Sequence, residues 1–311
     1  MIGIEVGSNN LRLIQWDGKI VRRCIEYPLP DNIYVNSRIS SFKLLSECLQ
    51  QAMREHKLSG REAAVIIPAS YHMMRRLHLP LMTVQQLETN LPYEFRDFLS
   101  DDKDAYVFDY SVNEITEDEN GTKMMDITAV AARKDIIESY RSLCRSAGLK
   151  MTVALPIEVA YSNYIRKFGD IQREYCIIDL GNSKTRIYFY RGAVHEATRI
   201  IEYGTNHISQ PVEATVGANA EIIARDSINA MYNIIATDVR KAINFYSFNN
   251  RESEISELYV CGAGVKYPEL IDAIDQATQL DIREISDMLP ADFDRREDLA
   301  MFIQAFSAVL Q

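Results

Sequence analysis

The chain has 311 residues, of which 47% are hydrophobic and 25% are charged, so its composition is that of a globular protein with about two domains. Its 34 Lys and Arg residues against 44 Asp and Glu residues give a formal net charge of −10, which argues against direct nucleic-acid binding. The five cysteines are scattered and form no Cys-x-x-Cys pair, which excludes zinc-finger and disulfide-stapled classes. The sequence has no run of about 18 apolar residues and no signal-peptide pattern, which excludes membrane-spanning and secreted classes. We therefore expect a reduced, cytoplasmic protein.

Apolar periodicity and turn residues predict strands and helices along the whole chain. A hairpin at 4–20 is followed by a helix at 40–57, strands at 63–69 and 73–80, a capped helix from 83, and strands at 107–115 and 123–133. A helix at 136–147, a strand at 151–155 and a helix ending near 168 precede a second hairpin at 178–194. The remaining elements are a long amphipathic helix at 230–248, a strand at 258–260, a helix starting near Pro268 and a helix at 299–310.

The two hairpins are copies of one pattern. Residues 4–20 read IEVGSNNLRLIQWDGKI and residues 178–194 read IDLGNSKTRIYFYRGAV, an offset of 178 − 4 = 174. This offset pairs Glu5 with Asp179, Gly7 with Gly181, Arg12 with Arg186 and Gly18 with Gly192. Such agreement predicts two related domains.

Each copy places an acid before a turn of Gly and small polar residues. The missing Cβ of Gly lets the backbone approach a ligand closely, and clustered N–H groups favour a phosphate. The acid can hold the Mg²⁺ that accompanies a phosphate, often through water. Two such turns facing each other would hold the phosphates of a nucleotide from both sides, whereas either turn alone could be an ordinary hairpin. The turn Cys261-Gly262-Ala263-Gly264, between a strand and a helix, is a third candidate that packing alone could also explain.

The two hairpins and the later Gly-x-Gly turn resemble the actin, hexokinase and heat-shock ATPase superfamily. Within it, residues 64–110 (AVIIPASYHMMRRLHLP, then LETNLPYEFRDFL, then YVFDY) resemble the PilM family of type IV pilus assembly proteins. Residues 128–155 (TAVAARKDIIESYRSLCRSAGLKMTVAL) are similar to the same family through their AA-x-K and AGL elements. The likeness extends over essentially the whole chain, and the related cell-division ATPase FtsA is the alternative family.

The resemblance implies an α/β fold of two duplicated actin-like (ribonuclease H-like) domains with a small inserted α+β subdomain. The first half would comprise residues 1–60 and 151–170, and the inserted, partner-binding subdomain would comprise residues 61–150. The second half would comprise residues 171–311, with a reduced fourth subdomain because only about twenty residues separate Gly204 from the helix at 230–248.

The resemblance also implies a site for ATP and Mg²⁺. The metal ligands would be Glu5 and Asp179, and the catalytic residues would be Asp179 and Glu158, which would orient an attacking water. The cofactor-binding residues would be Gly7, Ser8, Asn9, Asn10, Gly181, Asn182, Ser183, Thr185, Glu221, Arg225, Gly262, Ala263 and Gly264. For Glu158, an acid favoured at a helix N-terminus is the alternative.

Several positions depart from the family pattern. Glu5 stands where Asp is usual, Ala263 interrupts two glycines that are usually consecutive, and Arg225 replaces a usual Lys. A binding cleft is therefore expected, whereas turnover is left open, at most that of a slow ATPase. Arg12 and Arg186 are expected on a solvated strand face rather than at the phosphates.

The partner implied by the resemblance is the cytosolic peptide of a PilN-like inner-membrane protein, which would add to a strand of the inserted subdomain. The groove candidates are Met73, Leu77, Leu79, Leu91 and Phe95, with the subdomain core as the alternative. We therefore expect a cytoplasmic, ATP-binding scaffold of a type IV pilus or related secretion machine, held at the inner face of the cell membrane only through partners, with self-association left open. An FtsA-like filament protein, a sugar kinase and a nucleotide-free scaffold are the other classes.

Overall fold

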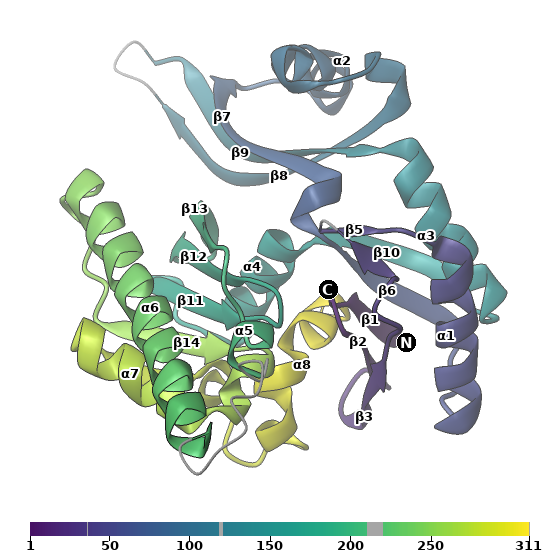
Figure 1. Cartoon of the computed structure of the whole chain (residues 1–311). Coiled ribbons are helices and arrows are strands. Elements are labelled where there is room, and N and C mark those ends of the chain that lie inside the picture. Colours follow the sequence, from purple (N-terminus) through teal and green to yellow (C-terminus); the bar gives the residue numbers. More distant parts are fainter. Residues whose placement is uncertain (36, 118–120, 210–219, 311) are drawn as a thin grey trace.

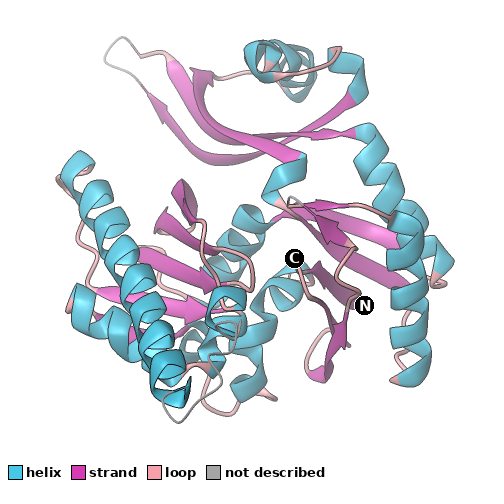
Figure 2. Cartoon of the chain, in the orientation of Figure 1, coloured by secondary structure: helices cyan, strands magenta, loops and turns pink. Residues whose placement is uncertain are grey.

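The computed structural model describes residues 1–35, 37–117, 121–209 and 220–310, without the side chains of 209 and 220–224. Two lobes, each built on a β-sheet, lie side by side, and a smaller unit lies above one of them (Figure 1). Helices cover the outer faces of both sheets (Figure 2). Among the described residues, no helix combines the length and the apolar composition that crossing a bilayer requires.

The first lobe contains a five-stranded sheet in the order β10-β6-β1-β2-β3. Its strands are β1 (Ile2–Val6), β2 (Asn10–Trp16), β3 (Val21–Pro28), β6 (Glu62–Ile67) and β10 (Lys150–Pro156). The short strands β4 (Tyr34–Val35) and β5 (Arg38–Ile39) pair separately. Helices α1 (Phe42–Glu55) and α3 (Lys134–Ser146) contact each other on the outer side and bury Leu45, Leu49 and Tyr140 in one core. The side chain of Ser41 caps α1.

The second lobe repeats this sheet. Its order is β13-β12-β11-β14-β15, with the pairing directions of the first sheet. The strands are β11 (Glu174–Leu180), β12 (Thr185–Arg191), β13 (Val194–Ile201), β14 (Glu257–Cys261) and β15 (Asp281–Glu284). The helices are α5 (Asn206–Ser209), α6 (Ala220–Asn249) and α7 (Pro268–Thr278), and α6 and α7 pack together. The duplication predicted from the 174-residue offset is confirmed, and α6 begins before the predicted 230–248.

Two helices, α4 (Ile157–Phe168) and α8 (Arg296–Ala308), lie between the sheets (Figure 1). Together they bury a large aromatic core that includes Tyr161, Tyr164 and Phe306. Although α8 lies late in the chain, it packs on β1, β2 and β6 of the first lobe. The contact is close, because a Cβ on Gly3 would lie 2.1 Å from the carbonyl oxygen of Ala305.

The smaller unit is a three-stranded antiparallel sheet covered by one helix. Its order is β7-β9-β8, from β7 (His72–Pro80), β8 (Tyr106–Glu117) and β9 (Lys123–Arg133), and the helix is α2 (Val84–Glu94), which starts at the capping box formed by Thr83 and Gln86. Strand β6 and helix α3 fall inside the predicted range 61–150, but β6 pairs with β1 and α3 packs on β10. The pairing therefore supports narrower limits, 72–133, for the proposed inserted subdomain.

Candidate functional site

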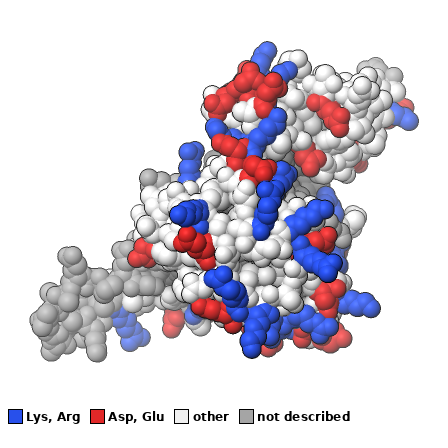
Figure 3. Space-filling model, turned by 90° about the vertical axis from the view of Figure 1, so that its right-hand side faces the viewer, with Lys and Arg blue, Asp and Glu red and all other residues white. Residues whose placement is uncertain are grey.

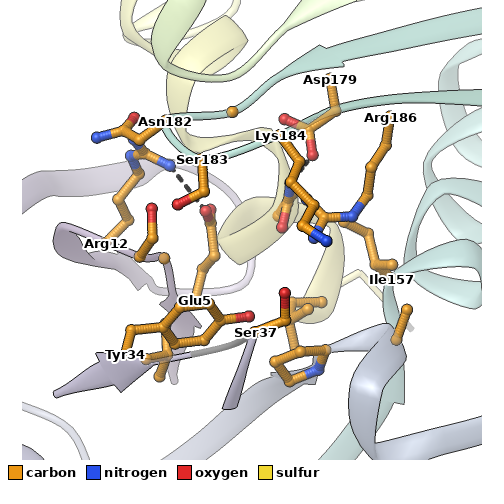
Figure 4. A pocket seen from close by; sticks show the side chains of 18 of the residues that line it. Glu5, Arg12, Tyr34, Ser37, Ile157, Asp179, Asn182, Ser183, Lys184 and Arg186 are labelled. Carbon is orange, nitrogen blue, oxygen red and sulfur yellow. Dashed lines mark hydrogen bonds and ion pairs between the residues drawn. The ribbon is translucent and has the colours of Figure 1, made fainter. Parts of the chain in front are cut away.

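The turn between β1 and β2 faces the turn between β11 and β12 across the space between the lobes (Figure 4). Together they line a cavity of about 80 Å³, room for several water molecules or a phosphate-sized group. Of the predicted site residues, the structure gathers Glu5, Gly7, Ser8, Asn9, Asn10, Asp179, Gly181, Asn182 and Ser183 around this cavity. The wall also includes Arg12, Tyr34, Lys184, Arg186 and Gln304, which were not among the predicted ligand contacts.

In the first hairpin, Glu5 and Arg12 lie directly opposite each other on β1 and β2. The Arg12 guanidinium donates to Glu5 Oε1 over 2.8 Å and to Glu26 Oε1 over 3.2 Å, and Arg12 and Glu5 are both buried. Burial raises the pKa of Glu5 to about 7, although the Arg12 charge lowers it. The prediction that Arg12 lies on a solvated strand face is wrong, because this face of the sheet points into the space between the lobes.

In the second hairpin, Asp179 and Arg186 occupy the same register, on β11 and β12. Here the acid accepts a hydrogen bond over 2.9 Å from the Gln304 amide of α8 instead. Burial raises the pKa of Asp179. Arg186 is partly buried in the cavity wall and, within the described chain, has no hydrogen bond or ion pair, so its predicted place on a solvated face is also wrong.

Several polar groups of the cavity have no partner among the described residues. The backbone N–H groups of Ser8, Asn9, Asn182 and Ser183 donate no hydrogen bond there. Buried oxygens without a partner are Glu5 Oε2, Asn182 Oδ1 and the Tyr188 hydroxyl oxygen. Buried oxygens without a partner are uncommon in a folded interior, and their clustering around one cavity, beside backbone N–H groups that are free to donate, is typical of a ligand site.

Glu158 does not line this cavity. It is buried at the start of α4, where its Oε2 lies 3.0 Å from His72 Nε2 at the base of the smaller unit. Burial raises the pKa of Glu158, but the hydrogen bond and charge of His72 outweigh burial and lower it below its ordinary value. The carboxylate therefore joins α4 to β7.

The turn after β14 also lies outside the cavity lining. Two further predicted residues lie outside it as well: Thr185 is buried, and Arg225 is exposed on α6. A Cβ on Gly262 would lie 2.5 Å from Asp179 Oδ1, and one on Gly264 would lie 2.3 Å from the Leu180 Cβ. Packing against β11 thus accounts for both glycines, with Ala263 buried between them. The side chain of Glu221 lies outside the described residues.

A second cavity, of about 250 Å³, lies between the smaller unit and the first lobe. It is lined mainly by apolar side chains from β8, β9, β10, α3 and α4, among them Val107, Phe108, Val130, Ala154, Leu155 and Val159. The groove predicted from Met73, Leu77, Leu79, Leu91 and Phe95 is wrong, because α2 covers that face of the sheet and Leu77, Leu91 and Phe95 form its core. The lining of the 250 Å³ cavity comes from separate segments of the chain, so no single stretch of sequence indicates it.

Two similar five-stranded sheets, with facing hairpin turns at the cavity between them, define an actin-like ATPase fold. The solved PilM–PilN type IV pilus biogenesis complex is similar, with a TM-score of 0.78 and 17% identity, covering 99% of this chain and 96% of that one. The ethanolamine utilization protein EutJ from Carboxydothermus hydrogenoformans has a TM-score of 0.55 at 12% identity, with coverage of 100% and 89%. The archaeal actin homolog Ta0583 has a TM-score of 0.50 at 11% identity, with coverage of 99% and 98%.

The family model of the type IV pilus assembly protein PilM matches residues 3–301. The chain therefore belongs to the PilM family. A search of curated protein sequences found no match.

Proposed function

We propose that this chain is the cytoplasmic scaffold of a type IV pilus assembly machine, and that it docks the cytosolic peptide of a PilN-like inner-membrane protein. Membership of the PilM family supports this role, and the solved structure with a TM-score of 0.78 is that of a PilM–PilN complex. The partner would hold the chain at the inner face of the cell membrane.

Figure 3 shows that acidic and basic side chains are interspersed on one face of the molecule and form no separate acidic and basic patches.

The apolar cavity beneath the smaller unit carries the proposal for the docking site. Within the described chain, β8 and β10 are each the outermost strand of their sheet, and both line this cavity. An extended peptide adding to such an edge would satisfy free backbone groups while its alternate side chains fill apolar pockets. A docked peptide would thus contact the inserted subdomain and the first lobe together.

The proposal is tested by measuring the affinity of two variants, each with one substitution in β8, for the peptide. Val107 is 38% exposed and lines the cavity, whereas Val112 is 44% exposed on the same strand outside the lining. Val107→Arg should weaken binding of a labelled PilN-like N-terminal peptide, measured by fluorescence anisotropy, by about tenfold or more, because it buries an unpaired charge. Val112→Arg should bind as the wild type does. Equal effects of the two substitutions would place the peptide elsewhere.

We also propose ATP as the ligand of the smaller, polar cavity between the two hairpins. Its unpartnered N–H groups and its place in an actin-like fold support a bound phosphate chain. The predicted Mg²⁺ at Glu5 and Asp179 fits these residues poorly, because Arg12 already neutralises Glu5 and Gln304 holds Asp179. Calorimetric titration with ATP tests the proposal, and absence of binding at millimolar ATP would leave a nucleotide-free scaffold.

A further inference from the structure

We propose that the cavity between the hairpins binds the phosphate groups of a nucleotide without a divalent metal ion. Arg186 would contact the phosphate, and the ion pairs of Arg12 with Glu5 and Glu26 would keep a metal ion from Glu5. This inference rests on the proposed nucleotide binding and specifies its chemistry. It follows from a difference between the two copies of the hairpin.

Both copies place an acid directly opposite an arginine, at Glu5–Arg12 and at Asp179–Arg186. In the first copy the pair is closed, with 2.8 Å between Arg12 Nη1 and Glu5 Oε1. In the second copy the acid is held by Gln304, and the arginine has no bonded partner in the described chain. The repeated register thus yields one committed cation and one that is available to a ligand.

Arg12 competes with a metal ion for Glu5, because its guanidinium already bonds Glu5 Oε1. Its guanidinium lies between the carboxylates of Glu5 and Glu26, and the pair with Glu5 is fully buried in the cavity wall. A divalent cation on the remaining Glu5 oxygen would lie within a few ångströms of this fixed positive charge. Repulsion at that distance in a partly buried site is costly, so the ion pair disfavours metal binding.

Arg186 has the chemistry that a phosphate requires. Its planar guanidinium offers several N–H donors that match two phosphate oxygens at once. It lines the cavity together with the turn that carries the unpartnered N–H groups of Asn182 and Ser183. Figure 4 shows Arg186 on the wall opposite Arg12. Lys184, the other cation of this wall, is already paired with Glu202 over 2.8 Å.

The experiment is titration of the full chain with ATP, and with pyrophosphate, in Mg²⁺ and in EDTA. We expect the wild-type Kd for ATP to change less than about threefold on removing Mg²⁺. Arg186→Gln should weaken binding about tenfold or more, and Arg186→Lys should recover part of the loss. Arg191→Gln, at the exposed far end of β12, is the matched control and should bind as the wild type does. Equal melting temperatures of the variants confirm that they fold.

The outcomes separate this inference from the proposed function. Binding that requires Mg²⁺ would overturn metal-free recognition while leaving nucleotide binding in place. Unchanged affinity in Arg186→Gln would overturn the role of Arg186. No binding of ATP in either buffer, with the PilN-like peptide still bound, would overturn both the inference and the nucleotide part of the proposed function.

Discussion

The contact between Glu158 and His72 shows how one side chain can join two parts of the fold. The carboxylate is buried at the start of α4, and the ring at the start of β7 lies 3.0 Å away. The Tyr190 hydroxyl donates to the Glu158 carbonyl oxygen over 2.8 Å, so the backbone there is also fixed. A buried ionised group with such partners stabilises the fold only while it remains charged.

Replacing Glu158 should therefore change the pH dependence of stability. Because its pKa is lowered in the folded chain, its stabilisation is fully present above the ordinary value of 4.5 and is lost as the pH falls through the folded-state pKa. Glu158→Gln should lower the melting temperature at pH 7, and its melting temperature should then decline less than that of the wild type between about pH 5 and pH 3. Glu138→Gln, at an exposed ion pair on α3, is the control. If the melting temperatures of the wild type and Glu158→Gln fall in parallel with pH, Glu158 is not the buried carboxylate whose charge stabilises the fold.

Gly262 is a second position where a single residue determines local structure. It has φ +86° and no room for a Cβ, whereas Gly18 has φ +101° and nothing within 4 Å. Both alanine variants cost about 1–3 kcal/mol for a backbone with positive φ, but Gly262→Ala also forces Asp179 to move. We expect the fall in free energy of unfolding, measured by urea titration, to be clearly larger for Gly262→Ala than for Gly18→Ala. Equal losses of unfolding free energy in the two variants would mean that the Asp179 side chain moves aside at no cost.

At the scale of elements, the sequence pattern predicted more of the fold than of the site. Apolar periodicity and the Thr83–Gln86 capping box located the long helices and most strands, though not the short β4, β5, β15 and α5, and the hairpin repeat indicated the duplicated sheets. Because successive side chains of a strand point to opposite faces, the sequence of β2 predicts which residues share a face with Arg12. It does not predict whether that face contacts solvent or another lobe. The same limit applies to the apolar cavity beneath the smaller unit, whose walls come from segments between 67 and 159 that only the folded chain brings together.

The packing of α8 on β1 gives a prediction at this scale. A Cβ at residue 3 would overlap the Ala305 carbonyl oxygen at 2.1 Å, whereas one at Gly60 would meet only the Ile2 side chain at 3.1 Å. Gly3→Ala should therefore lower the free energy of unfolding by about 3 kcal/mol or more, and Gly60→Ala by much less. Chemical denaturation followed by circular dichroism measures both. A Gly3→Ala variant as stable as the wild type would show that α8 can shift along the sheet.

For the whole molecule, polar contacts join the two lobes beside the cavity, at Asn9 and at Glu26, which bonds Arg12 of its wall. The side-chain amides of Asn9 and Asn206 bond to each other at 2.9 and 3.2 Å, and Lys266 pairs with Glu26 over 3.1 Å. These contacts are exposed, so each contributes little to stability by itself. Their position nonetheless lets them bias the angle between the lobes.

Removing these contacts should open the molecule without unfolding it. The double substitution Asn206→Ala and Lys266→Ala should increase the radius of gyration measured by small-angle X-ray scattering and leave the melting temperature nearly unchanged. The control is Lys241→Ala, whose ion pair with Asp238 lies within α6. Scattering curves that superimpose would show that the aromatic core around α4 and α8 fixes the angle by itself.

The position of α8 also has a consequence for biosynthesis. Strand β1, Ile2–Val6, is covered by a helix that begins at Arg296, so the sheet of the first lobe cannot complete its core until the ribosome has delivered that distant helix. Until then a nascent chain exposes the apolar surface that α8 covers, and exposed apolar surface is the condition that recruits chaperones. We expect stalled nascent chains that end before residue 296 to remain sensitive to protease over their N-terminal lobe.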